Sequence, residues 1–175
     1  MLTRRDLYRY GSVLLGGAMS LGLAIPGVAY VLDPLRRKSE SGATQELTRL
    51  SALKVGVPQS FPIIAERQDA WVKYPPEPVG SVWLIRQPAG SSPPVVAFTA
   101  ECPHLGCAIA MAGDGKTFLC PCHKSIFDLA GKPINDLSPR SMDTLDVELT
   151  GDDDPGVVVH FQRYRTQTKE KIPLV

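Results

Sequence analysis

The chain has 175 residues with a formal net charge of +1, and 43% of its residues are hydrophobic. A charge this close to zero gives no support for nucleic-acid binding, so we expect no nucleic acid among its partners. Once an amino-terminal segment is set aside, about 130 residues remain, which is enough for one domain with its own core.

The amino-terminal segment, residues 1–32, is predicted to be a membrane anchor. Residues 11–32 contain no charged side chain. As a helix that rises about 1.5 Å per residue, this stretch reaches about 33 Å and can cross a bilayer core of roughly 30 Å. Residues 3–9 contain Arg4-Arg5 and resemble a twin-arginine export signal, which carries proteins that have already folded. An ordinary positively charged flank is the alternative interpretation.

The basic residues around this segment do not set its orientation, because three lie on each side of it: Arg4, Arg5 and Arg9, then Arg36, Arg37 and Lys38. The export signal predicts that the rest of the chain lies on the periplasmic or outer side of a bacterial cytoplasmic membrane. Gly27-Val28-Ala29 could be a cleavage site, but we expect a retained, single-pass anchor.

A polar stretch, residues 33–45, is predicted to be a flexible linker, and a simple spacer fits equally well. Residues 46–175 form the predicted head, built from short strands and turns. The signal Gly113-Asp114-Gly115 predicts a hairpin between 108–111 and 118–120. The other predicted strands begin at 53–57 and continue with 82–86, 95–99, 145–149 and 157–161. No shape is predicted for residues 163–175.

All four cysteines and two of the three histidines lie in two short motifs, Cys102-Pro103-His104-Leu105-Gly106-Cys107 and Cys120-Pro121-Cys122-His123. Each motif joins a Cys to a His, and two thiolates with two imidazoles can hold a 2Fe–2S cluster. Structural zinc is the alternative, but zinc sites usually pair ligands of one type. The third histidine, His160, lies apart from both motifs and is interpreted as a packed or surface residue.

With Ser125 added, the motifs C-x-H-L-G-C and C-P-C-H-x-S resemble those of Rieske iron–sulfur subunits of quinol–cytochrome c reductases, the cytochrome bc and bf complexes. The resemblance implies a mainly β fold: an antiparallel β-sandwich head with a cluster-binding subdomain at about residues 100–139, on one amino-terminal transmembrane helix. It implies one Rieske-type 2Fe–2S cluster and a disulfide. The ligands would be Cys102 and Cys120 on one iron and His104 and His123 on the other, and the disulfide would join Cys107 to Cys122.

Neighbouring residues would tune the cluster. The resemblance makes Ser125 a hydrogen-bond donor to a bridging sulfide, although a loop serine could also bond its own backbone. Phe127 stands where high-potential members carry a tyrosine, so we expect a lower potential. Leu105 would sit at the docking tip, Lys124 replaces a common glycine, and Asn135 to Pro139 would form a cover loop.

The predicted function is electron transfer within a membrane quinol–cytochrome c reductase, with menaquinol favoured as the donor. His123 would contact the quinol and accept a proton, and a c-type cytochrome would receive the electron. The chain would act with a cytochrome b-type subunit in a multisubunit, dimeric complex and would be inactive alone. Two alternatives remain: the Rieske small subunit of arsenite oxidase, which has a molybdenum partner, and a zinc-stabilised binding module.

Overall fold

The computed structural model describes residues 3–36, 42–66, 68–69 and 72–174 of the chain. Two compact units are present. One contains the amino-terminal helix together with residues 68–69 and 72, and the other contains the six-stranded and three-stranded sheets and both cysteine–histidine motifs.

Helix α1 spans Arg4–Arg36 and begins with a capping box. The Thr3 hydroxyl accepts the backbone N–H of Asp6 at 3.2 Å, and the Asp6 carboxylate accepts the backbone N–H of Thr3 at 3.1 Å. These bonds satisfy N–H groups that a helix start leaves unpaired. The segment Arg4–Asp33 contains an 18-residue window with a mean hydropathy of 1.7 and is long and apolar enough to cross a membrane, a test that a signal sequence would also meet. The predicted amino-terminal apolar helix is confirmed.

The predicted linker, residues 33–45, needs correction at both ends. Its first residues continue helix α1 to Arg36, and its last residues belong to strand β1, Gly42–Arg49. Strand β1 forms because it pairs with β11, Gly156–Gln162, from Gly42↔Gln162 onward. A polar composition is compatible with such an edge strand. Residues 37–41 lie outside the described residues, and the domain limits remain a prediction.

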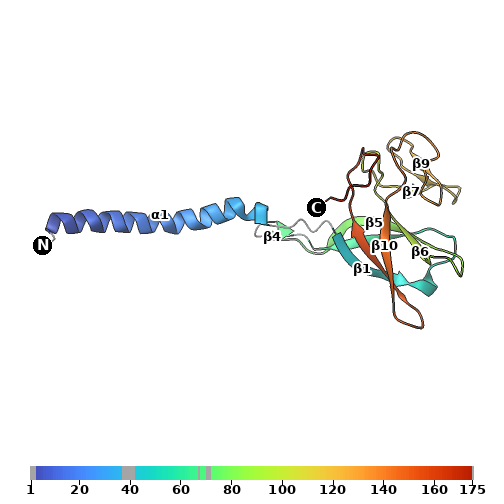
Figure 1. The fold of residues 1–175 in the computed structure, drawn as a ribbon, viewed down its shortest axis with the longest axis horizontal. Helices are drawn as coiled ribbons and strands as arrows, with labels where there is room; N and C mark the ends of the chain where they lie inside the picture. The colour runs from blue at the N-terminus through green and yellow to red at the C-terminus, as the bar shows by residue number, and fades with distance from the viewer. Residues whose placement is uncertain (1–2, 37–41, 67, 70–71, 175) are drawn as a thin grey trace. The chain divides into compact units, whose positions relative to one another are not determined.

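The head contains one six-stranded sheet in the order β1-β11-β10-β6-β5-β2, in which every neighbouring pair is antiparallel. Strand β10 joins its two halves, because Thr144 and Leu145 pair with β6 and the rest of β10 pairs with β11. The two edge strands also meet, since the backbone N–H of Ile64 donates to Gln45 Oε1 at 3.2 Å. The curled sheet therefore nearly closes (Figure 1), and the mainly β, antiparallel fold is confirmed. The remaining strands of the sheet are β2 Gln59–Ala65, β5 Glu77–Arg86, β6 Val95–Thr99 and β10 Thr144–Thr150.

One predicted strand is wrong. Residues 53–57 do not begin the head, because β1 precedes them and Val55 makes only an isolated bridge with Arg86. Leu53 instead follows the short 3-10 helix η1, Leu50–Ala52, and packs into the core of the sheet. The predicted strands at 82–86, 95–99, 145–149 and 157–161 lie within β5, β6, β10 and β11. A separate two-stranded pair is formed by β3 Gln68–Asp69 and β4 Val72–Lys73.

A smaller sheet carries the motif region at one end of the head (Figure 1). Its strands are β7 Ala110–Met111, β8 Phe118–Leu119 and β9 Ile126–Phe127, in that order. The predicted hairpin joins β7 to β8. At its turn Asp114 Oδ1 accepts the backbone N–H of Lys116 at 2.8 Å, and this bond, with others from Thr117, lowers the pKa of the Asp114 carboxyl.

A second apolar core lies between this smaller sheet and the large one. Its buried members include Phe98 and Phe118, and Trp83 packs against them with its ring 5.3 Å from that of Phe118. Cys102 and Cys120 belong to the same core. Both motifs are therefore fixed to packed side chains rather than to free loops.

Candidate metal centre

The first loop, residues 102–107, is closed by its own backbone. The N–H of Cys102 donates to the carbonyl of Cys107 at 2.9 Å, and the N–H of Gly106 donates to the carbonyl of Cys102 at 2.8 Å. Gly106 has φ +79°, a left-handed conformation that glycine adopts without steric cost.

The second loop, residues 120–125, repeats this arrangement. The N–H of Cys120 donates to the carbonyl of Ser125 at 2.9 Å, and the N–H of Lys124 donates to the carbonyl of Cys120 at 3.0 Å. Lys124 holds the position that Gly106 holds in the first loop, with φ +62°. Each loop thus presents a cysteine at its start from an equivalent backbone turn.

A disulfide joins the loops. Cys107 and Cys122 are bonded with an S–S distance of 2.04 Å and a Cα–Cα distance of 6.5 Å, so the predicted pairing is confirmed. Cys102 and Cys120 remain thiols and are buried. The sulfur of Cys120 lies within 4.8 Å of both disulfide sulfurs. Since those two sulfurs are bonded to each other, they are not available as ligands.

The two motif histidines face each other across the loops. Their ring centroids are 4.9 Å apart, and their planes meet at 77°. His104 is partly buried, whereas His123 is exposed. Among the described residues, only two buried side-chain nitrogen or oxygen atoms lack a hydrogen-bond partner, and these are Nδ1 of His104 and Oγ of Ser125.

Burial raises the pKa of the Cys102 thiol, and the neighbouring Cys120 raises it further. The backbone N–H of His104 lowers the pKa of Cys102, and the Ser125 hydroxyl lowers it by a smaller amount. Two adjacent buried thiols are hard to ionise together unless a cation is bound between them. Together with the unpartnered imidazole nitrogen of His104, this donor set fits an iron group bound through both sulfur and nitrogen.

A family model for the Rieske [2Fe-2S] domain matches residues 64–146. This part of the chain is a Rieske domain. The match includes both loops, the disulfide and the smaller sheet.

Curated relatives agree with this assignment. The menaquinol:cytochrome c reductase iron-sulfur subunit of Bacillus subtilis is 27% identical over 141 residues, covering 79% of this chain and 80% of the relative. The cytochrome b6-f complex iron-sulfur subunit of Trichodesmium erythraeum is 33% identical over 72 residues, 41% of this chain and 39% of the relative. Among solved structures, a hyperthermophilic respiratory complex III matches with 20% identity and a TM-score of 0.43, covering 86% of this chain and 98% of that one. The resemblance to subunits of the bc and bf complexes is confirmed.

The cofactor of this Rieske domain is a [2Fe-2S] cluster. The prediction of a 2Fe–2S cluster is thereby confirmed in place of the structural zinc alternative. Which side chains hold the cluster is taken up as a proposal below.

The predicted cover loop lies beside the first loop. Asp136, Leu137 and Pro139 line a cavity of about 470 Å³ together with His104, Leu105 and Gln167. Leu105 is 44% exposed at this surface. The side chain of Asn135 ties the cover loop to the second loop, because its Nδ2 donates to the carbonyl of Lys124 at 2.8 Å and its Oδ1 accepts the N–H of Ile126 at 3.2 Å.

The left-handed backbone of Lys124 yields a stability prediction. A side chain with φ near +60° is strained, and glycine relieves that strain. We expect Lys124→Gly to raise the free energy of unfolding by roughly 0.5–1 kcal/mol, measured by urea denaturation at equal iron content. Lys116→Gly is the matched control, because Lys116 is also exposed but does not have a positive φ. An equal gain in both variants would contradict the explanation.

Several residues that contact this region were not found from the sequence. Gln167 reaches the cavity beside His104, and Arg163 pairs with Glu101 immediately before Cys102. Arg140 forms a buried ion pair with Asp143. None carries a local motif. The sequence offers one signal, the excess of Arg and Lys in residues 163–175, a segment for which it predicts no shape.

Proposed function

We propose that the chain is the iron–sulfur subunit of a membrane quinol–cytochrome c reductase and that its donor is a menaquinol. The observation that carries this proposal is the similarity to menaquinol:cytochrome c reductase iron-sulfur subunits of Bacillus subtilis and Geobacillus thermodenitrificans over about four-fifths of each chain. Helix α1 supplies the membrane anchor. The head lies on the outer side of the membrane, which the disulfide supports because disulfides persist in oxidising compartments.

The proposed ligands of the cluster come from equivalent places in the two loops. Cys102 and Cys120 hold one iron, and His104 and His123 hold the other. Support comes from the two buried thiols and from the buried Nδ1 of His104, which has no partner among the described residues. The disulfide of Cys107 and Cys122 keeps the two pairs of ligands together.

When bound, such a cluster accepts and releases one electron at a time. His123 is exposed, so its imidazole can meet the hydroxyl of a quinol and hold one of the released protons on the ring nitrogen that is not a ligand. The half-exposed Leu105 provides an apolar contact at the docking surface. Ser125, buried with an unpartnered hydroxyl, donates a hydrogen bond toward the cluster.

The partner decides between this function and the alternative. We expect the full chain, purified from membranes in mild detergent, to retain a b-type haem protein and a c-type cytochrome. Recovery of a molybdenum protein in place of the b-type haem protein would contradict the proposal and favour arsenite oxidase. A quinol oxidation assay on the isolated chain should show no turnover, because the other subunits supply most of the quinol pocket.

A second support for menaquinol is Phe127, which is fully buried in the same core as Cys102 and Cys120. A tyrosine hydroxyl here would add a hydrogen bond that favours the more negative, reduced cluster. We expect Phe127→Tyr to raise the midpoint potential by roughly 40 mV, corresponding to about 1 kcal/mol for a one-electron couple. A redox titration of the full chain measures it.

Phe118→Tyr is the control for this variant, because Phe118 is equally buried and pairs with Phe127 across the smaller sheet. It adds a hydroxyl to the same core at another place. If the potential of Phe127→Tyr does not rise, or if both variants shift it alike, the case for a low-potential donor is lost.

A further inference from the structure

The C-terminal hairpin, residues 163–174, has a defined conformation. The N–H of Arg165 donates to the carbonyl of Ile172 at 2.8 Å, and the N–H of Leu174 donates to the carbonyl of Arg163 at 2.8 Å. These bonds leave residues 166–171 as a loop that projects from the end of strand β11. The hairpin is distant in sequence from the first loop but lies against it.

Two contacts join the hairpin to the first loop and to Glu101, the residue before it. The N–H of Gln167 donates to the carbonyl of Pro103 at 2.9 Å. Arg163 forms a two-pronged ion pair with Glu101, with distances of 3.1 Å from Nε and 2.9 Å from Nη2 to the two carboxylate oxygens. A methyl group built on Gly106 would lie 3.6 Å from the side chain of Thr166. The loop is therefore supported on both sides of Cys102, and the side chain of Thr166 lies near Gly106 at its end.

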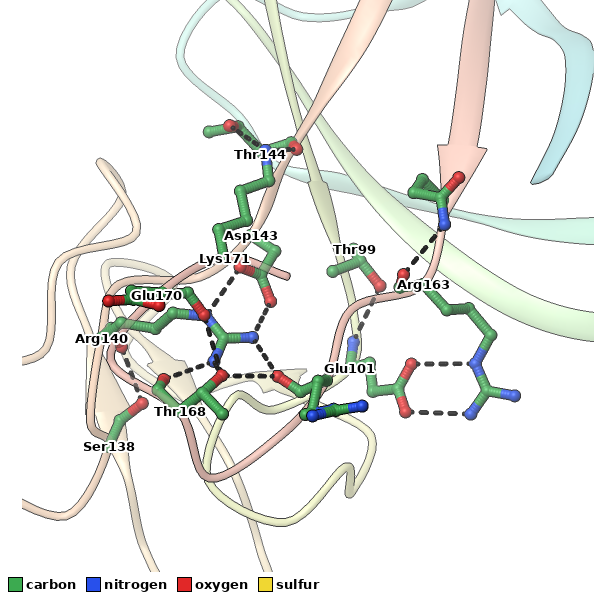
Figure 2. Close-up of polar contacts among 12 residues, drawn as sticks. Thr99, Glu101, Ser138, Arg140, Asp143, Thr144, Arg163, Thr168, Glu170 and Lys171 are labelled. Carbon is green, nitrogen blue, oxygen red and sulfur yellow. Dashed lines mark hydrogen bonds and ion pairs between the residues drawn. The ribbon is translucent and has the colours of Figure 1, made fainter. Parts of the chain in front are cut away.

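The hairpin is held by a buried arginine outside it. Arg140 Nε and Nη2 donate to the two carboxylate oxygens of Asp143 at 2.9 and 2.7 Å. The same guanidinium donates to the backbone carbonyls of Thr168 at 2.6 Å and Arg165 at 2.8 Å. Figure 2 shows Arg140 between Asp143 and Thr168, and the Glu101–Arg163 pair beside them. The side chains of Arg140 and Asp143 are only 8% and 4% exposed.

Arg140 and Asp143 are also hydrogen-bonded to the cover loop and to the large sheet. The Ser138 hydroxyl donates to the carbonyl of Arg140 at 2.7 Å, and the N–H of Thr99 donates to the carbonyl of Asp143 at 2.9 Å. A guanidinium suits this place because its planar fork can satisfy a carboxylate and two carbonyls at once, which an ammonium group cannot. Without it, Asp143 would be a buried charge with no cation, and two carbonyls of the hairpin would lose their donor.

We propose that the C-terminal hairpin is a strap that positions the first loop, and that Arg140 is the positioning residue that anchors this strap. The proposal rests on the proposed function only in taking Cys102 and His104 as ligands. The strap acts on the ligand loop from outside, whereas the disulfide acts between the two loops. Gln167 of the strap also lines the cavity beside His104.

The test is amide hydrogen exchange of the full chain in detergent, read by mass spectrometry. In Arg140→Gln, peptides covering residues 102–107 should exchange about tenfold faster, because charge-assisted hydrogen bonds that hold the strap are lost. Peptides from β11 should not change. Arg49→Gln is the control, since Arg49 pairs with Glu46 on strand β1 and donates to the carbonyl of Asp154. Its first loop should exchange as in the wild type.

The cluster provides a second measurement, which should not change if Arg140 only stabilises the fold. In the iron-loaded Arg140→Gln chain, we expect a shifted electron paramagnetic resonance spectrum and faster loss of the cluster, with Arg140→Lys restoring neither fully. Equal acceleration of exchange in the first loop and in β11 would overturn the proposal. So would faster exchange in the hairpin with no change in the first loop.

A variant that fails to fold does not leave the proposal untested. Arg163→Gln removes only the half-exposed pair with Glu101, and it should accelerate exchange in residues 102–107 by a smaller factor. No change there would also overturn the proposal. If the wild-type chain proves free of iron, the ligand assignment fails, but the exchange comparison still decides whether the strap positions the loop.

Discussion

Replacing His123 by alanine is expected to abolish assembly of the [2Fe-2S] cluster. In the proposed ligand set, one iron would lose one of its two imidazoles, and the free cysteine of the second loop, Cys120, is already assigned to the other iron. Loss of a mere partner of a metal ligand lowers affinity roughly 10- to 100-fold, so loss of a ligand should exceed this. Iron content and the electron paramagnetic resonance spectrum of the reduced full chain measure the effect.

His160→Ala is the matched control for this experiment. His160 is the third histidine, 44% exposed on β11, and its ring contacts Thr44 at 3.0 Å and Glu148 at 3.6 Å instead of the loops. The control should retain iron and spectrum. A His123→Ala chain with two irons and an unchanged spectrum would remove His123 from the ligand set and from its proposed role toward quinol.

Removing the disulfide is expected to have the second large effect, this time on stability. Cys107 and Cys122 are separated by 15 residues in the sequence, and closing a loop of this size stabilises a fold by about 3 kcal/mol. We expect the double variant Cys107→Ser, Cys122→Ser to lose roughly 2–5 kcal/mol of unfolding free energy, measured by urea denaturation at equal iron content. Changing both residues avoids a new pairing with Cys120.

Treatment with a reductant provides the control. Dithiothreitol should destabilise the wild-type chain toward the level of the double variant and should have no effect on the variant itself. The spectrum of whatever cluster is retained should keep its mixed sulfur–nitrogen character. If the variant instead loses an iron ligand spectroscopically, Cys107 or Cys122 is a ligand, and the assignment of the other two cysteines is wrong.

The parts of the site that could be predicted are those encoded locally. The Cys–His spacings, the Gly113-Asp114-Gly115 turn and the alternation along β10 each depend on residues close together in the sequence. A hairpin turn between two motifs brings the motifs together whatever the rest of the fold does. The resemblance then supplied the disulfide pairing, which the structure confirms.

What could not be predicted depends on distant partners. Strand β1 looks like a polar linker until β11, more than 100 residues later, offers it hydrogen bonds. Arg140 and Thr168 lie 28 residues apart, and neither segment contains a sequence pattern that predicts this contact. The same holds for Arg163 and Glu101, 62 residues apart. Burial of a charged side chain becomes visible only when its partners are assembled around it.

The disulfide has a consequence for the topology of the chain. The bond between Cys107 and Cys122 makes residues 107–122 a covalent ring. The exposed turn around Asp114 and Lys116 lies in the middle of this ring, and the two loops meet at the disulfide. A backbone cut by trypsin at Lys116 would leave the two fragments joined until the disulfide is reduced. The turn is therefore a suitable place to insert a peptide tag or a fluorophore, since the covalent connection between the loops does not depend on the peptide bonds there.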